Sequence, residues 1–354
     1  MRYRPLFLAL VLTVGLVPPA EGRDVPCSFD GVDRVVAVGD VHGAYDNLIV
    51  ILKAAGLVDE QLSWIGGRAH FVQVGDIVDR GPDSRRVLDL YRRLEKEAAA
   101  AGGRVHVLLG NHEQMRLIGD RRYVSEGEYK AFETDGSAVL KANFLESLVD
   151  NLELKKYFEG QPLGALEMIQ AFGRNETYGK YLLSLNSVIR INGVVFAHGG
   201  ISPSTATMSC TEINDTIRRE LSADLDKTKA EPTKTLAVGE DGPLWYRGLA
   251  MEPDTFGPEV ESILKAQQAT AMVVAHTPQA GGRITVRFGG RVFLIDTGIQ
   301  TLYVPDGRPS ALELKGRVFT SIYPLTTLKP WPPTEPVPAP APALPPTPAP
   351  APAS

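Results

Sequence analysis

Five short loops in this chain place metal-binding side chains beside glycine or another small residue, and each loop follows an apolar run. The five loops are Gly39-Asp40-Val41-His42-Gly43, Gly75-Asp76-Ile77-Val78-Asp79-Arg80-Gly81, Gly110-Asn111-His112-Glu113, His198-Gly199-Gly200 and Ala275-His276-Thr277. In open α/β sheets, sites form beyond the carboxyl ends of strands. Glycine allows the positive φ and the close backbone approach that such loops need. The repeated pattern predicts one site assembled from several strand ends.

The distribution of histidine supports this interpretation. Of the six histidines, four lie in these loops, namely His42, His112, His198 and His276. Chance does not place four histidines after apolar strands and beside Asp, Asn or Gly. We expect the other two, His70 and His106, to be structural residues.

Six loop side chains are expected to bind metal through nitrogen or oxygen, namely Asp40, His42, Asp76, Asn111, His198 and His276. Six donors are more than one ion needs, and a carboxylate such as Asp76 can bridge two ions. Two ions about 3.5–4 Å apart serve in-line displacement at phosphorus, because they acidify a bridging water and neutralise phosphate charge. Such ligands suit Mn, Fe, Zn or Ni. We expect two divalent metal ions, with Mn as the first candidate.

Hydrolysis of a phosphate ester also needs cationic groups for the phosphate oxygens and a proton donor for the leaving oxygen. Arg80 lies in the second loop, and Arg247 lies in a separate Trp-Tyr-Arg-Gly motif. His112 follows the expected ligand Asn111 directly, so it lies near the ions without having to bind them, and Asp79 is placed to orient its ring. An ordinary surface or capping role is the alternative for Arg247.

The elements that must position these residues alternate between strand and helix. Strands are predicted over 35–38, 71–74 and 105–109, and helices over 46–55 and 84–100. In the second half, a hairpin over 187–197 turns at Asn192-Gly193, and strands follow over 271–275, 284–288 and 291–295. The pattern predicts an α/β fold with two facing mixed β-sheets flanked by helices. Residues 23–323 would form the catalytic domain, with a helical insertion over 117–185.

The two ends of the chain differ from this body. Residues 1–22 combine Arg2 and Arg4 with an apolar core over 6–17 and a small-residue cleavage site, which is typical of an export signal. We therefore predict a periplasmic or secreted protein without stable membrane insertion after cleavage; an uncleaved N-terminal anchor is the alternative. Residues 324–354 are rich in Pro and Ala and predict a disordered tail. A formal net charge of -5 argues against a nucleic-acid partner.

Export would bring Cys27 and Cys210 into an oxidising compartment. They form either a disulfide or two unrelated thiols, and the sequence leaves both possibilities open. Neither can be the nucleophile of a cysteine-type phosphatase, because Asp33 and Thr216 stand where that mechanism requires arginine.

The first four loops resemble the serine/threonine phosphoprotein phosphatase signature within the calcineurin-like metallophosphoesterases. The resemblance covers about residues 35–316. Two segments narrow it to the Shewanella-like protein phosphatases, namely Leu117-Ile118-Gly119-Asp120-Arg121-Arg122-Tyr123-Val124 and Trp245-Tyr246-Arg247-Gly248. The chain departs from the eukaryotic members in lacking a Ser-Ala-Pro-Asn-Tyr loop, and Ile295-Asp296-Thr297-Gly298 stands about there.

The resemblance implies a role for each site residue. One ion would be held by Asp40, His42 and Asp76, and the other by Asp76, Asn111, His198 and His276. It also implies that His112 is a general acid paired with Asp79, and that Arg80 and Arg247 bind the phosphate. The division of the ligands between the two ions and the role of His112 as general acid come from the family resemblance.

We expect a phosphomonoesterase that acts on phosphoproteins, with phosphotyrosine favoured over phosphoserine and phosphothreonine. Tyr123 and Tyr129 in the insertion are candidates for contact with the substrate's ring or peptide. The alternative is a nucleotide hydrolase similar to diadenosine tetraphosphatases. A phosphodiesterase is disfavoured because Ala275-His276-Thr277-Pro278 lacks the second histidine of a Gly-His-Xaa-His end. A catalytically inactive binding module is the third class.

Overall fold

The computed structural model describes residues 25–324. The predicted export signal lies outside the described residues, and so does the predicted tail except for Pro324. Within the described part of the chain, no helix combines the length and apolar character needed to cross a membrane.

The first sheet contains five strands in the order β11-β10-β2-β3-β4. Its parallel part is β2 (Arg34–Val38), β3 (His70–Gln73) and β4 (Arg104–Val107). Two helices connect these strands, α1 (Tyr45–Ala54) and α2 (Ser84–Ala100), as the apolar periodicity predicts. Because the three strands run in parallel, their carboxyl ends meet at one edge of the sheet.

The second sheet contains six strands in the order β1-β5-β6-β7-β9-β8. Its bounds are β1 (Ser28–Phe29), β5 (Val188–Ile191), β6 (Val194–Ala197), β7 (Ala271–Val274), β8 (Thr285–Arg287) and β9 (Val292–Leu294). The hairpin β5–β6 turns at Asn192 and Gly193, both with positive φ, as the Asn-Gly pair predicts. Strands β6, β7 and β9 are parallel, so they too bring their carboxyl ends to one edge.

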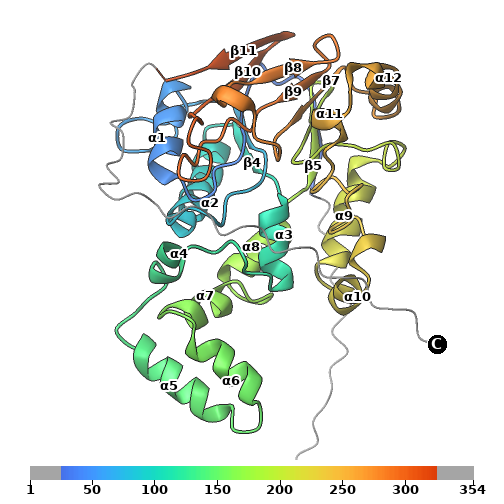
Figure 1. Cartoon of the computed structure of the whole chain (residues 1–354). Helices are drawn as coiled ribbons and strands as arrows, with labels where there is room; N and C mark the ends of the chain where they lie inside the picture. The colour runs from blue at the N-terminus through green and yellow to red at the C-terminus, as the bar shows by residue number, and fades with distance from the viewer. Residues whose placement is uncertain (1–24, 325–354) are drawn as a thin grey trace, which may run out of the picture.

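The two sheets face each other, and the alternation of side chains along each strand explains why. Val35 and Ala37 of β2 pack in one apolar cluster with Phe196 and Val273 of the second sheet. Val36 points to the opposite face, where the core contains apolar residues of the helices. Figure 1 shows the sheets together at one end of the molecule, with α1 and α2 beside the first sheet. The predicted class, two facing mixed sheets flanked by helices, is confirmed.

Helices fill the segment between β4 and β5. They are α3 (Asn111–Ile118), α4 (Glu126–Lys130), α5 (Ser137–Ser147), α6 (Leu152–Glu159), α7 (Ala165–Ala171) and α8 (Thr177–Ser184). Figure 1 shows α5 and α6 at the end of the molecule away from the sheets. Helix α3 belongs to the site and runs one residue past the predicted start of the insertion, whereas α4 to α8 lie within it. We refer to α4–α8 as the helical insertion.

Most of the remaining helices lie between β6 and β7. They are α9 (Cys210–Glu220), α10 (Leu225–Ala230), η1 (Pro232–Lys234), α11 (Gly248–Met251), η2 (Asp254–Phe256) and α12 (Gly257–Ala266). A further short helix, η3 (Ala280–Gly282), follows β7. Cys27 and Cys210 form a disulfide, with their Cα atoms 6.1 Å apart, which decides between the two possibilities that the sequence left open. The bond joins the start of the described chain to the first residue of α9.

Strands β10 (Ala311–Lys315) and β11 (Val318–Ile322) have no counterpart among the predicted strands. The sequence of β10, Ala-Leu-Glu-Leu-Lys, consists of strong helix formers, so local propensity opposes a strand. Tertiary packing overrides that propensity. Leu312 and Leu314 face the core between the sheets, and β10 pairs antiparallel with β2.

Candidate metal and phosphate site

The five loops meet where the carboxyl edges of the two sheets come together. Asp40 and His42 follow β2, Asp76 follows β3, and His198 and His276 follow β6 and β7. All of them except His198 border a pocket of about 230 Å³. It is lined by Asp40, His42, Asp76, Arg80, Asn111, His112, Arg122, Tyr123, Trp245, Arg247, His276, Pro278, Asp296 and Tyr303. His198 is fully buried behind this lining, and its Nε2 lies 2.9 Å from the side-chain oxygen of Asn111.

Strained backbone conformations concentrate in these loops. Positive φ angles occur at five non-glycine residues of the site, namely His42 (46°), Asp76 (50°), Asp79 (71°), Arg80 (68°) and His276 (66°). Such conformations are uncommon for residues with a Cβ and persist only where the surrounding structure enforces them. The strained residues therefore coincide with the loops that carry the site residues.

Glu113 holds two of the loops together. Its Oε1 accepts the backbone N–H groups of Ile77 and Val78 at 2.7 and 3.0 Å, and its Oε2 accepts those of Asp76 and Gly110 at 2.8 Å. Glu113 is completely buried. One carboxylate therefore satisfies four backbone donors and fixes the loop that carries Asp76, Asp79 and Arg80. We predicted no role for Glu113, although it belongs to the third loop motif.

Asp76 is the common member of two groups that could hold metal ions. His42, Asp76 and His112 form one group and Asp76, His198 and His276 the other, each with ligand atoms within 4.8 Å of one another. Oδ2 of Asp76 lies 3.5 Å from Nε2 of His42 and 3.3 Å from Nε2 of His198. Asp76 therefore lies where one carboxylate could serve both groups, and the first group contains His112 in place of the expected Asp40.

The protonation states suit metal binding. Burial lowers the pKa of His42 to about 3 and holds the pKa of His276 well below its usual value. Both imidazoles are therefore neutral, which is the form that binds metal. Nε2 of His276 is buried without a hydrogen-bond partner among the described residues, which is costly unless something else binds it. The residues present thus fit two divalent ions.

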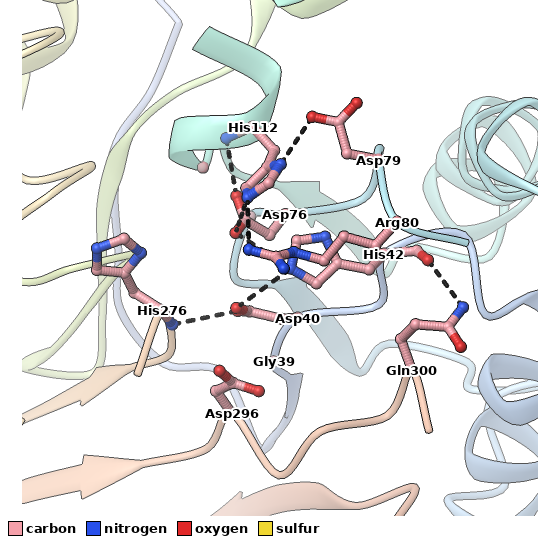
Figure 2. A network of polar contacts seen from close by, with 12 residues as sticks. Gly39, Asp40, His42, Asp76, Asp79, Arg80, His112, His276, Asp296 and Gln300 are labelled. Carbon is pink, nitrogen blue, oxygen red and sulfur yellow. Dashed lines mark hydrogen bonds and ion pairs between the residues drawn. The ribbon is translucent and has the colours of Figure 1, made fainter. Parts of the chain in front are cut away.

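Three buried carboxylates, Asp40, Asp76 and Asp296, lie side by side at the site. Burial raises the pKa of Asp40 well above its usual value, and the charges of Asp296 and Asp76 add to the effect. Burial also raises the pKa of Asp296 to about 6. Figure 2 shows Asp296 beside Asp40 on the side away from Asp76. A cation bound at the site would allow these buried carboxyls to ionise.

Asp296 was not predicted as a site residue. It directly follows the predicted strand 291–295, so the rule that found the other loops, a carboxylate after an apolar strand, would have included it. Tyr303 was also missed. Its ring centroid lies 3.5 Å from the guanidinium carbon of Arg80, and Tyr123 lies 4.9 Å from the same atom. Nothing in the sequence near Tyr303 signals this contact.

Asp79 and His112 form a hydrogen-bonded pair. Nδ1 of His112 lies 2.7 Å from Oδ2 of Asp79 (Figure 2), so its Nε2 atom faces the pocket, 3.9 Å from Oδ2 of Asp76. Burial by itself would raise the pKa of Asp79, but the Arg116 guanidinium and His112 outweigh it and hold that pKa below its usual value. An ionised Asp79 can orient the imidazole. This geometry suits proton donation from Nε2.

Arg80 and Arg247 lie on the lining of the pocket. Nη1 of Arg247 donates to the backbone oxygen of His276 and to Oγ1 of Thr277, both at 3.0 Å, so the side chain is fixed at the site. Tyr129, in contrast, is buried in the helical insertion and does not line the pocket. The prediction that Tyr129 could contact substrate is therefore wrong, because its ring packs inside its own helical layer. Tyr123 does line the pocket.

His70 and His106 lie apart from this site, as expected. They are adjacent on β3 and β4, where Nε2 of His106 lies 3.0 Å from Nδ1 of His70. Phe29 packs against both rings. The structure thus places both residues away from the candidate site, and their structural role stays a prediction.

Comparison with known proteins agrees with this geometry. An uncharacterised protein of Schizosaccharomyces pombe is 35% identical and aligns over 76% of this chain and 74% of its own length. Shewanella-like protein phosphatase 1 of Plasmodium berghei is 28% identical over 80% of this chain and 71% of its own. The crystal structure of a cold-active protein-tyrosine phosphatase of a psychrophilic Shewanella species superposes with a TM-score of 0.68, at 30% identity, covering 84% of this chain and 80% of that one.

Two facing sheets with paired His/Asp groups that share one carboxylate define a metallophosphoesterase. The model of the calcineurin-like phosphoesterase family matches residues 33–280, and this chain belongs to that family. Its relatives include the Shewanella-like protein phosphatases. The protein is a metal-dependent hydrolase of the phosphatase class.

Proposed function

We propose that this protein hydrolyses phosphate monoesters on proteins, with phosphotyrosine preferred over phosphoserine and phosphothreonine. The observation that carries the proposal is the lining of the pocket. Arg80 and Arg247 stand at the His/Asp groups, and the aromatic side chains of Tyr123, Tyr303 and Trp245 stand around them. Two arginines match a dianionic monoester, whereas a diester carries one charge less and an extra substituent.

The residues around the pocket have different roles in the proposed reaction. Two divalent ions, when bound by Asp40, His42, Asp76, Asn111, His198 and His276, would supply positive charge to the phosphate and lower the pKa of a water molecule. Arg80 and Arg247 bind phosphate oxygens. Nε2 of His112 gives its proton to the leaving oxygen, and Asp79 keeps the ring in the required orientation.

The aromatic lining of the pocket supports the proposed preference for phosphotyrosine. Tyr123 is 42% exposed and Tyr303 is 44% exposed, so both rings are available to a substrate ring. Aromatic pairs contribute about 0.5–1.5 kcal/mol beyond the area they bury, which corresponds to roughly 2- to 12-fold in affinity. The similarity to a protein-tyrosine phosphatase and to Shewanella-like protein phosphatases supports both the protein substrate and the preference.

We further propose that the protein works outside the cytoplasm. The export signal predicted at 1–22 motivates this, and the Cys27–Cys210 disulfide supports it, because disulfides form and persist in oxidising compartments. Fractionation of cells that express the full chain tests the location. Recovery with the cytoplasmic fraction, with both thiols free, would contradict it.

The substrate class is tested by comparing kcat/KM for peptides of one sequence that carry phosphotyrosine, phosphoserine or phosphothreonine. We expect phosphotyrosine to lead by roughly 2- to 12-fold, as the aromatic contribution allows. Bis-p-nitrophenyl phosphate and diadenosine tetraphosphate serve as diester and dinucleotide controls. Faster turnover of either control than of all three peptides would overturn the proposed class.

A further inference from the structure

Arg116 connects the helical insertion to the Asp79–His112 pair. Arg116 lies four residues after His112 on α3, so both side chains project from the same face of that helix. Nη2 of Arg116 donates to Oδ1 of Asp79 and also to Oε1 of Glu128, the latter at 3.1 Å. Oδ2 of Asp79 is bonded to His112. A continuous chain of hydrogen bonds thus runs from Glu128 of α4 to the imidazole of His112.

Every residue of this hydrogen-bond chain is buried. The exposed fractions are 0% for Asp79, 1% for Glu128, 2% for His112 and 5% for Arg116. A buried charge that loses its partner is strongly destabilising, so these side chains cannot exchange their contacts for water. The two oxygens of Asp79 have different partners, one Arg116 and the other His112. Arg116 therefore fixes the rotation of the carboxylate, and the carboxylate fixes the ring.

The insertion also surrounds the rest of the Arg116 side chain. Nη1 of Arg116 lies 3.3 Å from the sulfur of Met168 on α7, and its guanidinium carbon lies 4.8 Å from the ring centroid of Phe172. A planar guanidinium held by a carboxylate, a thioether and an aromatic face has little freedom to turn.

Helix α4, which carries Glu128, is itself fixed on the loop that follows β3 and on the first turn of α2. Oγ of Ser125 donates to the backbone oxygen of Gly81 at 3.0 Å, and Nη1 of Arg85 donates to that of Ala131 at 2.7 Å. Gly127 approaches Pro82 so closely that a Cβ at 127 would lie 2.5 Å from the Cβ of Pro82. Glu128 therefore has a defined position relative to Asp79 and not merely a contact through a flexible side chain.

We propose that Arg116 and Glu128 are positioning residues for the proton donor, and that the helical insertion thereby forms part of the reaction machinery. The inference rests on the proposed function, in which His112 gives a proton to the leaving oxygen. The insertion sets the orientation of His112 through Glu128, Arg116 and Asp79. A substitution at Glu128 or Arg116, the end of this hydrogen-bond chain nearest the insertion, therefore weakens proton donation and leaves phosphate binding intact.

The test compares Glu128→Gln with Glu126→Gln, the same substitution two residues earlier on the exposed side of α4. Each variant is assayed on p-nitrophenyl phosphate, whose leaving group needs little protonation, and on a phosphoserine peptide, whose leaving group needs much. We expect Glu128→Gln to lower kcat on the peptide by roughly tenfold, part of the ~10²–10⁴-fold contribution of a general acid. We expect less than about a twofold change on p-nitrophenyl phosphate, and no change from Glu126→Gln.

A double-mutant cycle with Asp79→Asn shows whether the effect passes through the pair. In the Asp79→Asn background, Glu128→Gln should have no further effect on the peptide, because coupled residues are not additive. Equal losses on both substrates, or full additivity with Asp79→Asn, would overturn the proposal. Should Glu128→Gln lack the native circular dichroism spectrum, Arg116→Lys replaces it, since lysine keeps the charge but lacks the planar fork.

The cycle also separates this inference from the function on which it rests. If His112→Asn and Asp79→Asn lower kcat by the same factor on the peptide and on p-nitrophenyl phosphate, His112 is not the proton donor and the proposed chemistry fails. If those two variants show the expected dependence on the leaving group and Glu128→Gln does not, only the positioning role of the insertion is wrong.

Discussion

At the scale of single residues, the site is defined by charges that are buried close together. Asp40, Asp76 and Asp296 are each at most 4% exposed, and the imidazoles around them are held neutral or paired with a carboxylate. No apolar environment tolerates such a set without a compensating partner. Single substitutions at the site can therefore test the role of one residue at a time.

Asp76→Asn should reduce the binding of both ions, because Asp76 belongs to both His/Asp groups. The expected result is a metal content well below that of the natural protein and a loss of turnover of roughly 10²-fold or more, since the ions supply several kcal/mol of transition-state stabilisation. Elemental analysis after gel filtration measures the first and kcat the second. Asp135→Asn, an exposed aspartate of the insertion, is the control. A variant with both ions bound and normal turnover would refute the shared-ligand assignment.

His112→Asn should lower kcat by about 10²–10⁴-fold on a phosphoserine or phosphotyrosine peptide, and by less on p-nitrophenyl phosphate. The physical reason is that a poor leaving group depends more on protonation. Steady-state kinetics on the two substrates measures the ratio. Equal losses would indicate that His112 acts as a metal ligand or as a structural residue.

At the scale of elements, the carboxyl ends of parallel strands place the loops, and buried side chains then fix the loop backbones. Glu113 at the start of α3 is the main example, since it satisfies backbone donors from two loops. The His70–His106 pair has a comparable structural role on the strands β3 and β4. Substitutions at Glu113 and at His70 therefore test how loops and strands are held in place, without changing a predicted metal ligand.

Glu113→Gln should destabilise the loop that follows β3, because one of the amide's two polar groups is a donor and cannot accept backbone N–H groups. The expected loss is about 1.5–3 kcal/mol, the usual size for hydrogen bonds to a charged group. Urea denaturation of the metal-free protein measures it, with Glu126→Gln as the control. An unchanged free energy of unfolding would show that the loop holds its conformation without Glu113.

The His70–His106 pair predicts acid sensitivity. Burial lowers the pKa of His70 from 6.5 to about 4 and that of His106 to about 3, so the unfolded chain takes up protons first as pH falls. The contribution to stability is complete above about pH 6.5 and declines as pH falls to about 4 for His70 and to about 3 for His106. Thermal unfolding should show a smaller loss of Tm between pH 7 and pH 5 in His70→Gln than in the natural protein. Identical dependence of Tm on pH in the two proteins would contradict the destabilisation expected from protonation of His70.

At the scale of the whole molecule, contacts between distant segments complete the two-sheet arrangement. The Cys27–Cys210 disulfide spans 183 residues, and β10 near the end of the described chain pairs with β2 near its start. Both contacts join segments on which the shared core between the sheets depends.

Replacing both cysteines, as Cys27→Ala with Cys210→Ala, should lower the free energy of unfolding by about 2–4 kcal/mol, because the bond restricts the unfolded chain over a long loop. Urea denaturation under oxidising conditions measures the change. Treatment of the natural protein with a reductant should give a similar shift, and the double variant should not respond to the reductant. Equal stability of both proteins would indicate that the bond contributes nothing to the fold.

The sequence by itself determined the features that depend on local pattern. Glycine and metal-binding residues directly after apolar runs identified nine of the ten predicted site residues, and the separate Trp-Tyr-Arg-Gly motif gave the tenth, Arg247. Periodicity identified α1 and α2, and the Asn-Gly turn identified the hairpin β5–β6. A strand end aims the next few residues at one edge of its sheet, so a ligand placed there is visible without knowledge of the partner strands.

Only the tertiary structure decided the features that depend on contacts between distant segments. It brought Asp296 next to Asp40, Tyr303 next to Arg80 and Glu128 within reach of Arg116, and it buried Tyr129 away from the pocket. It also placed β10 in a sheet against its helical propensity. These outcomes follow from which surfaces pack together. Apolar periodicity shows that one face of a segment is buried, but it does not show which remote segment covers that face.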